Sequence, residues 1–239
     1  MDQPNHKPCR LDRKTLAAAV RTLTRRDPAL RRLVRRDGPP PLWARPVGFA
    51  TLMRIILEQQ VSLASARATF SRLRAAVGVV LPRAVVALGF EGLRSVGFTR
   101  QKARYGFDCA QNILVGAFSL SALARAGDDA ARDELMRVRG VGRWTADIYL
   151  VMALRRPDIW PTGDLALQHA LMRARRLSSL PSTAEAARHA MDWAPWRAVA
   201  ARILWHAYLS ERRLARRSGG RYADSSVGES KRLRLGTAA

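Results

Sequence analysis

A short stretch, MRVRGVGRWTAD, combines residue types that can hold a phosphate through main-chain atoms. Gly140 can adopt a positive φ and so end the helix before it. Gly142 lacks a side chain where the chain enters the next helix, so the free N–H groups of that first turn can face an anion. Arg139 and Arg143 add positive charge beside the turn, and we expect Val141 to fill the gap between the helices. The pattern predicts two helices joined by a tight turn that binds a backbone phosphate and reads no bases.

Three acidic residues in and after this stretch are candidates for acid–base chemistry. We expect Asp147 on the polar face of the second helix and Asp158 in the loop that follows. Asp164 lies directly before an apolar helical run, where a carboxylate commonly caps the first turn. The helix dipole there also keeps the carboxylate ionised. From residue type alone, Asp164 is either only a cap or a cap that also takes part in chemistry.

The turn and the later Asp together resemble a known family. VRGVGRWTA resembles the helix-hairpin-helix of the DNA glycosylase superfamily, and IWPTGD ends at Asp164, where that family has its catalytic carboxylate. The chain is similar to the bacterial 3-methyladenine DNA glycosylase II type from about Asp27 to Tyr208. The resemblance implies an all-α fold of two helical lobes, with the hairpin and a catalytic cleft between them. It also implies hydrolytic removal of alkylated bases during base excision repair.

The chemistry of that family explains why one carboxylate suffices. The damaged nucleotide is first extruded from the duplex. Departure of the base leaves positive charge on the sugar, and a fixed carboxylate stabilises that charge and orients the attacking water. A base alkylated on a ring nitrogen is already cationic and leaves readily. By resemblance, Asp164 has this catalytic role.

The resemblance also places aromatic side chains around the extruded base. Trp144 and Trp205 match positions that wall the base pocket, where an electron-rich ring attracts a cationic purine. Core packing is the alternative for both tryptophans. The family often has Tyr where this chain has Ile148, with Tyr149 beside it, so the pocket wall and the range of accepted bases can differ. Relatives that also cut the DNA backbone have a Lys at the position of Trp144, so we expect no AP-lyase activity.

The expected contacts with duplex DNA lie in two segments. The segment EQQVS resembles one that faces the minor groove, where Gln60 fills the gap left by the extruded nucleotide. Alternatively, Gln59 and Gln60 only bridge helix ends. Arg100, Lys102 and Arg104 are candidates for phosphate contact, with a solvated charged face as the alternative. The expected DNA-binding residues are Gln60, Arg139, Gly140, Val141, Gly142, Arg143 and Thr145.

We expect no cofactor and no metal held by side chains. The chain has two cysteines, Cys9 and Cys109, which cannot supply the four thiolates of an iron–sulfur cluster. Its four histidines form no HExxH pattern. The family's hairpin often binds a monovalent cation through main-chain carbonyls, and the matching carbonyls belong to Met136, Val138 and Val141.

The charge balance favours a polyanionic partner. The chain carries 42 Lys and Arg against 19 Asp and Glu, for a net charge of +23. A GC-rich genome explains the preference for Arg over Lys but not the excess of basic over acidic residues. Double-stranded DNA containing damaged bases is therefore the expected partner. Apolar runs are too short for a membrane span and the N-terminus lacks an apolar signal core, so we expect no membrane partner and a location in the bacterial cytoplasm, associated with the nucleoid. We also expect a monomer.

Hydrophobic spacing predicts helices throughout and no strand. We expect a flexible leader, one glycosylase domain built from two lobes, and a disordered basic tail. The expected bounds are 1–10 for the leader, 11–217 for the domain, about 46–154 for lobe one, about 11–45 plus 155–217 for lobe two, and 218–239 for the tail.

Two other functions remain open from the sequence. The chain could be a glycosylase for a deaminated or oxidised base, which a panel of damaged duplexes would reveal. It could also be a non-catalytic helix-hairpin-helix DNA-binding protein, for which replacement of Asp164 would change no activity.

Overall fold

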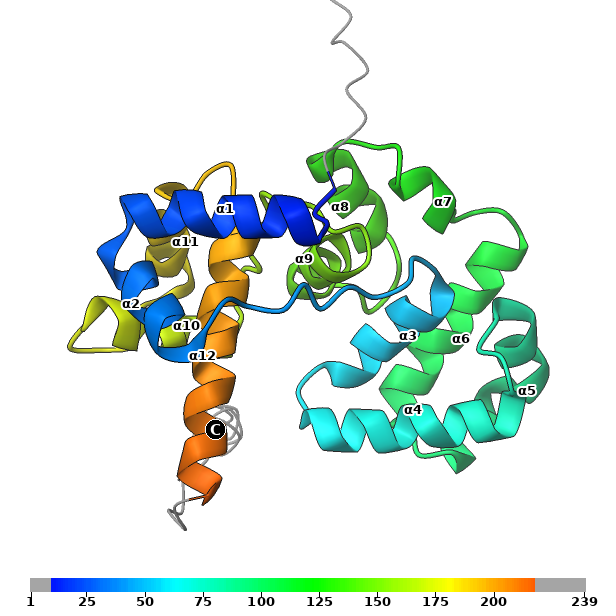
Figure 1. Cartoon of the computed structure of the whole chain (residues 1–239). Coiled ribbons are helices and arrows are strands. Elements are labelled where there is room, and N and C mark those ends of the chain that lie inside the picture. Colours follow the sequence, from blue (N-terminus) through cyan, green and yellow to red (C-terminus); the bar gives the residue numbers. More distant parts are fainter. Residues whose placement is uncertain (1–9, 218–239) are drawn as a thin grey trace, which may run out of the picture. The chain divides into compact units, whose positions relative to one another are not determined.

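A computed structural model describes residues 10–217, and this part of the chain consists of helices joined by turns and loops, without strands (Figure 1). The all-α prediction is confirmed. The expected tail over 218–239, and the expected leader except for Arg10, lie outside the described residues. Within the described residues, the chain forms two compact units, the first from residues 10–12 and Trp43–Thr162, and the second from Arg13–Leu42 and residues 163–217.

The first unit is organised around one apolar helix, α3. Its sequence FATLMRIILE buries eight of ten residues, and Leu52, Met53 and Ile55 are fully buried. Burial of such side chains is the main favourable term in folding. α3 packs against α4, α6 and α9. The helices of this unit are α3 (Phe49–Glu58), α4 (Leu63–Val77), α5 (Pro82–Ser95), α6 (Arg100–Leu114), α7 (Leu120–Leu123), α8 (Asp128–Met136) and α9 (Arg143–Met152).

Local sequence signals set where these helices begin and break. The hydroxyls of Ser62 and Thr99 accept main-chain N–H bonds at the starts of α4 and α6, as expected for N-caps. Pro82 occupies the first turn of α5, where its missing N–H costs nothing. Gly89 breaks the α-helical course of α5 with a φ of 76°, so that α5 consists of two short helical pieces.

The second unit is organised around α12, which packs against α1, α2, α10 and α11. Asp27 links its parts: its carboxylate accepts the N–H of Ala29 and Leu30 at the start of α2 and also the indole N–H of Trp193 and the guanidinium of Arg175. The helices are α1 (Arg13–Arg26), α2 (Pro28–Asp37), α10 (Leu165–Arg175), α11 (Thr183–Met191) and α12 (Arg197–Arg217).

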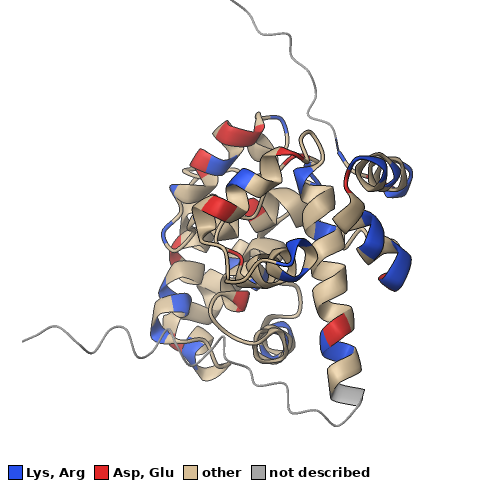
Figure 2. Cartoon of the chain, turned by 90° about the vertical axis from the view of Figure 1, so that its left-hand side faces the viewer, with Lys and Arg blue, Asp and Glu red and all other residues tan. Residues whose placement is uncertain are grey.

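Basic positions are spread along the ribbon of both units, and they outnumber acidic ones over the whole sequence (Figure 2). Within residues 10–217, no single helix has the length and apolar composition of a membrane span. Only α4 and α5 taken as a pair, bent by 107°, reach that length and composition.

Asp147 corrects one expectation from the sequence. It is fully buried rather than on a polar helix face, because α8 packs against the side of α9 that carries it. Its Oδ1 accepts from Arg132 Nε at 2.7 Å, and its Oδ2 accepts from the Thr162 N–H at 3.3 Å. Burial raises the pKa of Asp147, and the Arg132 guanidinium opposes that rise. Asp147 is therefore a structural carboxylate that, through Thr162, holds the end of the loop that leads to Asp164.

Replacing Asp147 with alanine should lower the free energy of unfolding by about 3–5 kcal/mol, because Arg132 would keep a buried charge without its main partner. The matched control is Asp129→Ala. Asp129 pairs with the same guanidinium, but its side chain is 92% exposed, so its loss should cost about 1 kcal/mol or less. Urea denaturation of the two variants and the wild type measures both values. Equal losses for the two variants would contradict the structural role assigned to Asp147.

Candidate functional site

The turn between α8 and α9 is closely packed at Gly140. This residue has a φ of 83°, which disfavours any residue with a side chain. A Cβ placed there would lie 2.1 Å from the ring of Tyr105 on α6, so the absence of a side chain lets the ring pack on the turn. Val138 and Val141 are buried on the inner side, as expected for Val141, and the Val141 N–H donates to the Val138 carbonyl at 2.9 Å.

Gln59 joins this turn to the end of α3. Its side-chain amide donates to the carbonyl of Gly140 and to the hydroxyl of Thr145, both at 2.8 Å. Thr145 is 2% exposed, so its side chain supports the hairpin from inside and presents no hydroxyl to solvent. For Gln59, the structure confirms that it bridges two elements.

The outer side of the turn presents main-chain donors and positive charge. No side chain caps the N-terminus of α9 at Gly142, and a Cβ built on Gly142 would meet no atom within 4 Å. The side chains of Arg139 and Arg143 are 70% and 57% exposed. First-turn N–H groups beside two cations form an anion-binding arrangement.

The turn after α3 presents Gln60 to solvent. Gln60 is exposed and has a φ of 53°, a left-handed conformation that a side-chain-bearing residue rarely adopts. Lys102 fixes the chain just before it, because its ammonium donates to the carbonyls of Leu57 and Gln59, both at 2.7 Å. Burial lowers the pKa of Lys102. Lys102 therefore holds the end of α3, and of the three basic candidates on α6 only Arg100 and Arg104 are exposed.

Asp164 is the N-cap of α10 in the second unit. Its Oδ1 accepts the N–H of Leu167 at 2.9 Å and the indole Nε1–H of Trp205, on α12, at 3.2 Å. The preceding Gly163 has a φ of 79°, which turns the chain into the helix. Asp164 is partly exposed, whereas Trp205 is 8% exposed. Two N–H donors on different helices therefore fix one oxygen of a carboxylate that remains accessible.

The other expected pocket residues lie in the first unit and differ in exposure. Trp144 is half-buried in the first turn of α9, and Ile148 is 5% exposed. Tyr149 is fully buried, its hydroxyl accepts the Gly48 N–H at 3.0 Å, and burial raises its pKa to about 12. Tyr149 therefore belongs to the core of the first unit and exposes no pocket wall.

Sequence reasoning missed how Tyr105 and Lys102 support the site. Tyr105 is half-buried on α6, and helical spacing alone does not show that its ring packs on Gly140. Residue type makes Lys102 a candidate for phosphate contact or part of a solvated face, whereas in the structure its ammonium binds two carbonyls at the end of α3. Within the described residues, no group of three or more His, Cys, Asp or Glu is placed to hold a metal ion.

Comparisons with known proteins indicate the same family that the sequence of the hairpin resembles. The Bacillus subtilis protein YfjP, which carries the provisional name of a DNA-3-methyladenine glycosylase, is 29% identical over 165 residues, which cover 66% of this chain and 58% of YfjP. DNA-3-methyladenine glycosylase 1 of Schizosaccharomyces pombe is 27% identical over 161 residues, which cover 66% of this chain and 71% of that protein. The chain thus spans less than two thirds of YfjP.

The fold agrees with these matches. The structure of the Schizosaccharomyces pombe 3-methyladenine DNA glycosylase Mag1 in complex with abasic DNA superimposes with a TM-score of 0.72 at 23% identity, covering 82% of this chain and 97% of Mag1. Residues 53–195, more than half of the chain, match the family described as the HhH-GPD superfamily base excision DNA repair protein. The chain belongs to the HhH-GPD superfamily of base excision DNA repair proteins.

Proposed function

We propose that this protein is a monofunctional DNA glycosylase that hydrolyses the N-glycosidic bond of alkylated bases, of the 3-methyladenine type, in double-stranded DNA. Family membership and the names of the relatives support a glycosylase acting on this class of base. The single observation that carries the proposal is Asp164, whose Oδ1 is held by two N–H donors.

In this proposal the Asp164 carboxylate stabilises the positive charge that develops on the sugar as the base departs. The N-terminus of α10 favours the ionised form of this carboxylate. The indole of Trp205 limits its rotation, so little reorganisation is needed when the charge develops. The same carboxylate can orient the attacking water and accept its proton.

The hairpin of the first unit has the donors for one DNA phosphate. The N–H groups at the start of α9 and the guanidinium groups of Arg139 and Arg143 would hold the phosphodiester and read no base. Gln60 would enter the space left by the extruded nucleotide, which its exposure and left-handed backbone support. The half-buried indole of Trp144 would contact the base through its π-face.

Exchanging Asp164 for asparagine should lower the rate of base release by about a hundredfold or more. The affinity for DNA and the free energy of unfolding should stay near those of the wild type. Asn caps a helix as well as Asp does and can still accept the two N–H bonds, so only the negative charge is lost. The measurement is release of alkylated bases from methylated duplex DNA under single-turnover conditions, with Asp158→Asn as the control carboxylate.

Wild-type activity in this assay separates the enzyme from a non-catalytic DNA-binding protein. If base release persists in Asp164→Asn but is lost in Asp158→Asn, the catalytic carboxylate would be that of Asp158 in the preceding loop. A wild type that binds DNA but releases no base from methylated or otherwise damaged duplexes would refute the enzymatic proposal.

The lack of AP-lyase activity rests on the residue in the first turn of α9. A Schiff base with the sugar requires a primary amine, and Trp144 has none. Lys102 is engaged with two carbonyls at the end of α3. We therefore expect hydrolysis of the base without cleavage of the strand.

Borohydride treatment of the protein with a damaged duplex should trap no covalent protein–DNA adduct, and the strand should stay intact until alkali is added. A bifunctional glycosylase on its own substrate is the positive control for trapping. An adduct with the wild-type protein would contradict the monofunctional assignment.

A further inference from the structure

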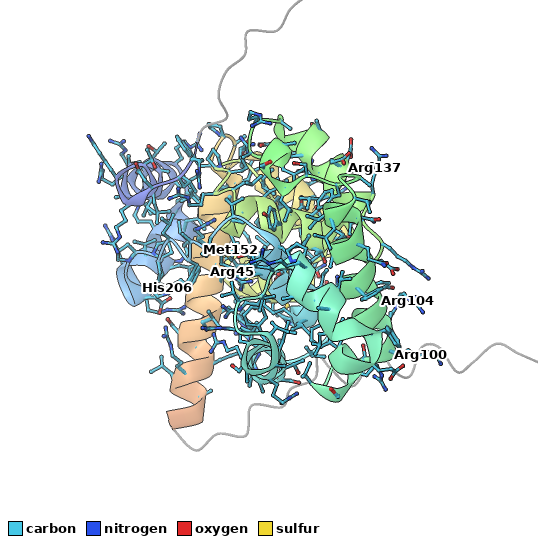
Figure 3. All side chains as sticks on the ribbon, turned by 90° about the vertical axis from the view of Figure 1, so that its right-hand side faces the viewer. Arg45, Arg100, Arg104, Arg137, Met152 and His206 are labelled. Carbon is cyan, nitrogen blue, oxygen red and sulfur yellow. The ribbon has the colours of Figure 1, made fainter. Side chains whose placement is uncertain are left out.

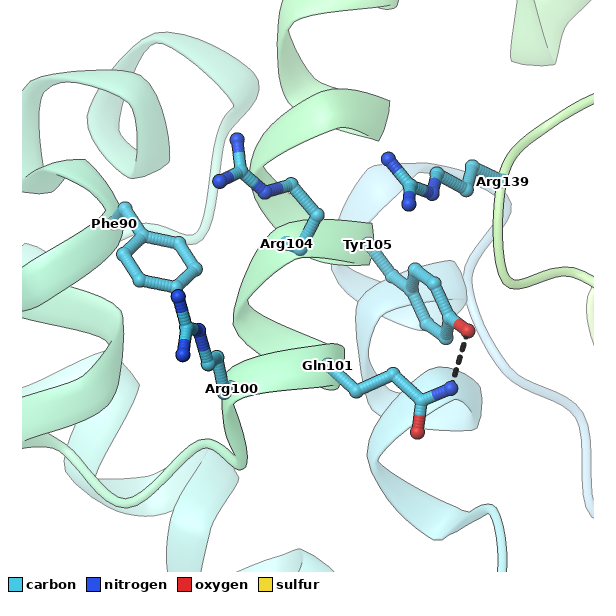
Figure 4. Close-up of a pocket in the computed structure, with 6 residues that line it drawn as sticks. All are labelled: Phe90, Arg100, Gln101, Arg104, Tyr105 and Arg139. Carbon is cyan, nitrogen blue, oxygen red and sulfur yellow. Dashed lines mark hydrogen bonds between the residues drawn. The ribbon is translucent and has the colours of Figure 1, made fainter.

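The first unit has a positively charged groove beside the hairpin, and of the residues that line it the proposed function uses only Arg139. It lies along α6 and has a volume of about 380 Å³. Figure 4 shows its lining: Phe90, Arg100, Gln101, Arg104, Tyr105 and Arg139. Three of these six residues carry a guanidinium group and none is acidic.

The groove continues directly from the hairpin. Arg139 belongs to the turn itself and also lines the groove. Tyr105 lines the groove with the same ring that packs on Gly140. A DNA strand whose phosphate is bound by the turn would therefore pass over this groove on one side of that phosphate.

The guanidinium groups are arranged at an electrostatic cost. Arg100 and Arg104 are four residues apart on α6, so they lie on one face, and like charges at this spacing repel each other. Both lie along the same edge of the first unit in Figure 3. Arg100 is also the first residue of α6, where the helix dipole disfavours a cation, and the first turn of α6 has no acidic residue. An anion bound in the groove would offset both the repulsion between Arg100 and Arg104 and the unfavourable interaction of Arg100 with the helix dipole.

The side chains are held in place yet exposed. The Arg104 guanidinium lies over the Phe90 ring, 5.0 Å from its centroid, and the Gln101 amide donates to the Tyr105 hydroxyl at 2.6 Å. Arg139 has an acidic neighbour, Asp108, at 3.6 Å, but its side chain is 70% exposed, so that surface pair is weak and can exchange for a phosphate.

We infer that this groove binds a second backbone phosphate of the duplex, on the strand whose neighbouring phosphate is held by the hairpin. The inference rests on the proposed function for its ligand, double-stranded DNA. The groove contributes affinity that does not depend on sequence or on damage, because guanidinium groups contact the backbone and no bases.

The test is equilibrium binding to a short undamaged duplex at salt concentrations between about 50 and 200 mM. The variant is the double substitution Arg100→Gln/Arg104→Gln. Each phosphate contact contributes about 0.9 to the slope of log K against log salt, so loss of one should reduce the slope by about 0.9 and the affinity at about 0.1 M salt roughly eightfold. The matched control is Arg83→Gln/Arg125→Gln, which removes two exposed arginines of the same unit that do not line the groove.

An unchanged slope in the groove variant, or equal reductions in the groove and control variants, would overturn the inference. So would a wild type without salt-dependent binding to the duplex. Because undamaged DNA is used, the result does not depend on base release. A protein that fails to release bases but shows the groove-specific change in slope would refute only the proposed glycosylase activity.

Discussion

Two hydrogen bonds to a single oxygen atom hold the proposed catalytic carboxylate in place. Asp164 Oδ1 accepts a main-chain N–H from its own helix, α10, and an indole N–H from α12. The first bond places the carboxylate at the positive end of a helix dipole, and the second ties it to the helix around which the second unit packs. A structural cap and a catalytic carboxylate are thus compatible uses of one residue.

In the first unit, side-chain contacts on the inner side of the hairpin support the main-chain donors on its outer side. Gln59 binds the hairpin from inside, Lys102 holds the end of α3, and Tyr105 packs where Gly140 has no side chain. These contacts leave the N-terminus of α9 uncapped and its flanking arginines exposed. The part of the unit suited to binding a DNA phosphate is therefore the start of α9, where no side chain of the protein caps the free N–H groups.

Much of this could be predicted from the sequence because the signals are local. Helix caps, the break at Gly89 and the turn at Gly140 follow from the conformational preferences of single residues. Partners distant in sequence could not be predicted in this way. From the sequence alone, Asp147 cannot be told from a surface carboxylate, because its partner Arg132 is on another helix. The burial of Tyr149 likewise depends on tertiary packing, which hydrophobic periodicity does not specify.

The most direct measurement is the single-turnover rate of base release by Trp205→Phe. Phenylalanine keeps an aromatic ring but cannot donate to Asp164. A hydrogen bond to a charged group is worth about 1.5–3 kcal/mol, so the rate should fall about tenfold or more while the affinity for DNA stays unchanged. A rate equal to that of the wild type would show that the indole N–H does not position the carboxylate, and would contradict the account.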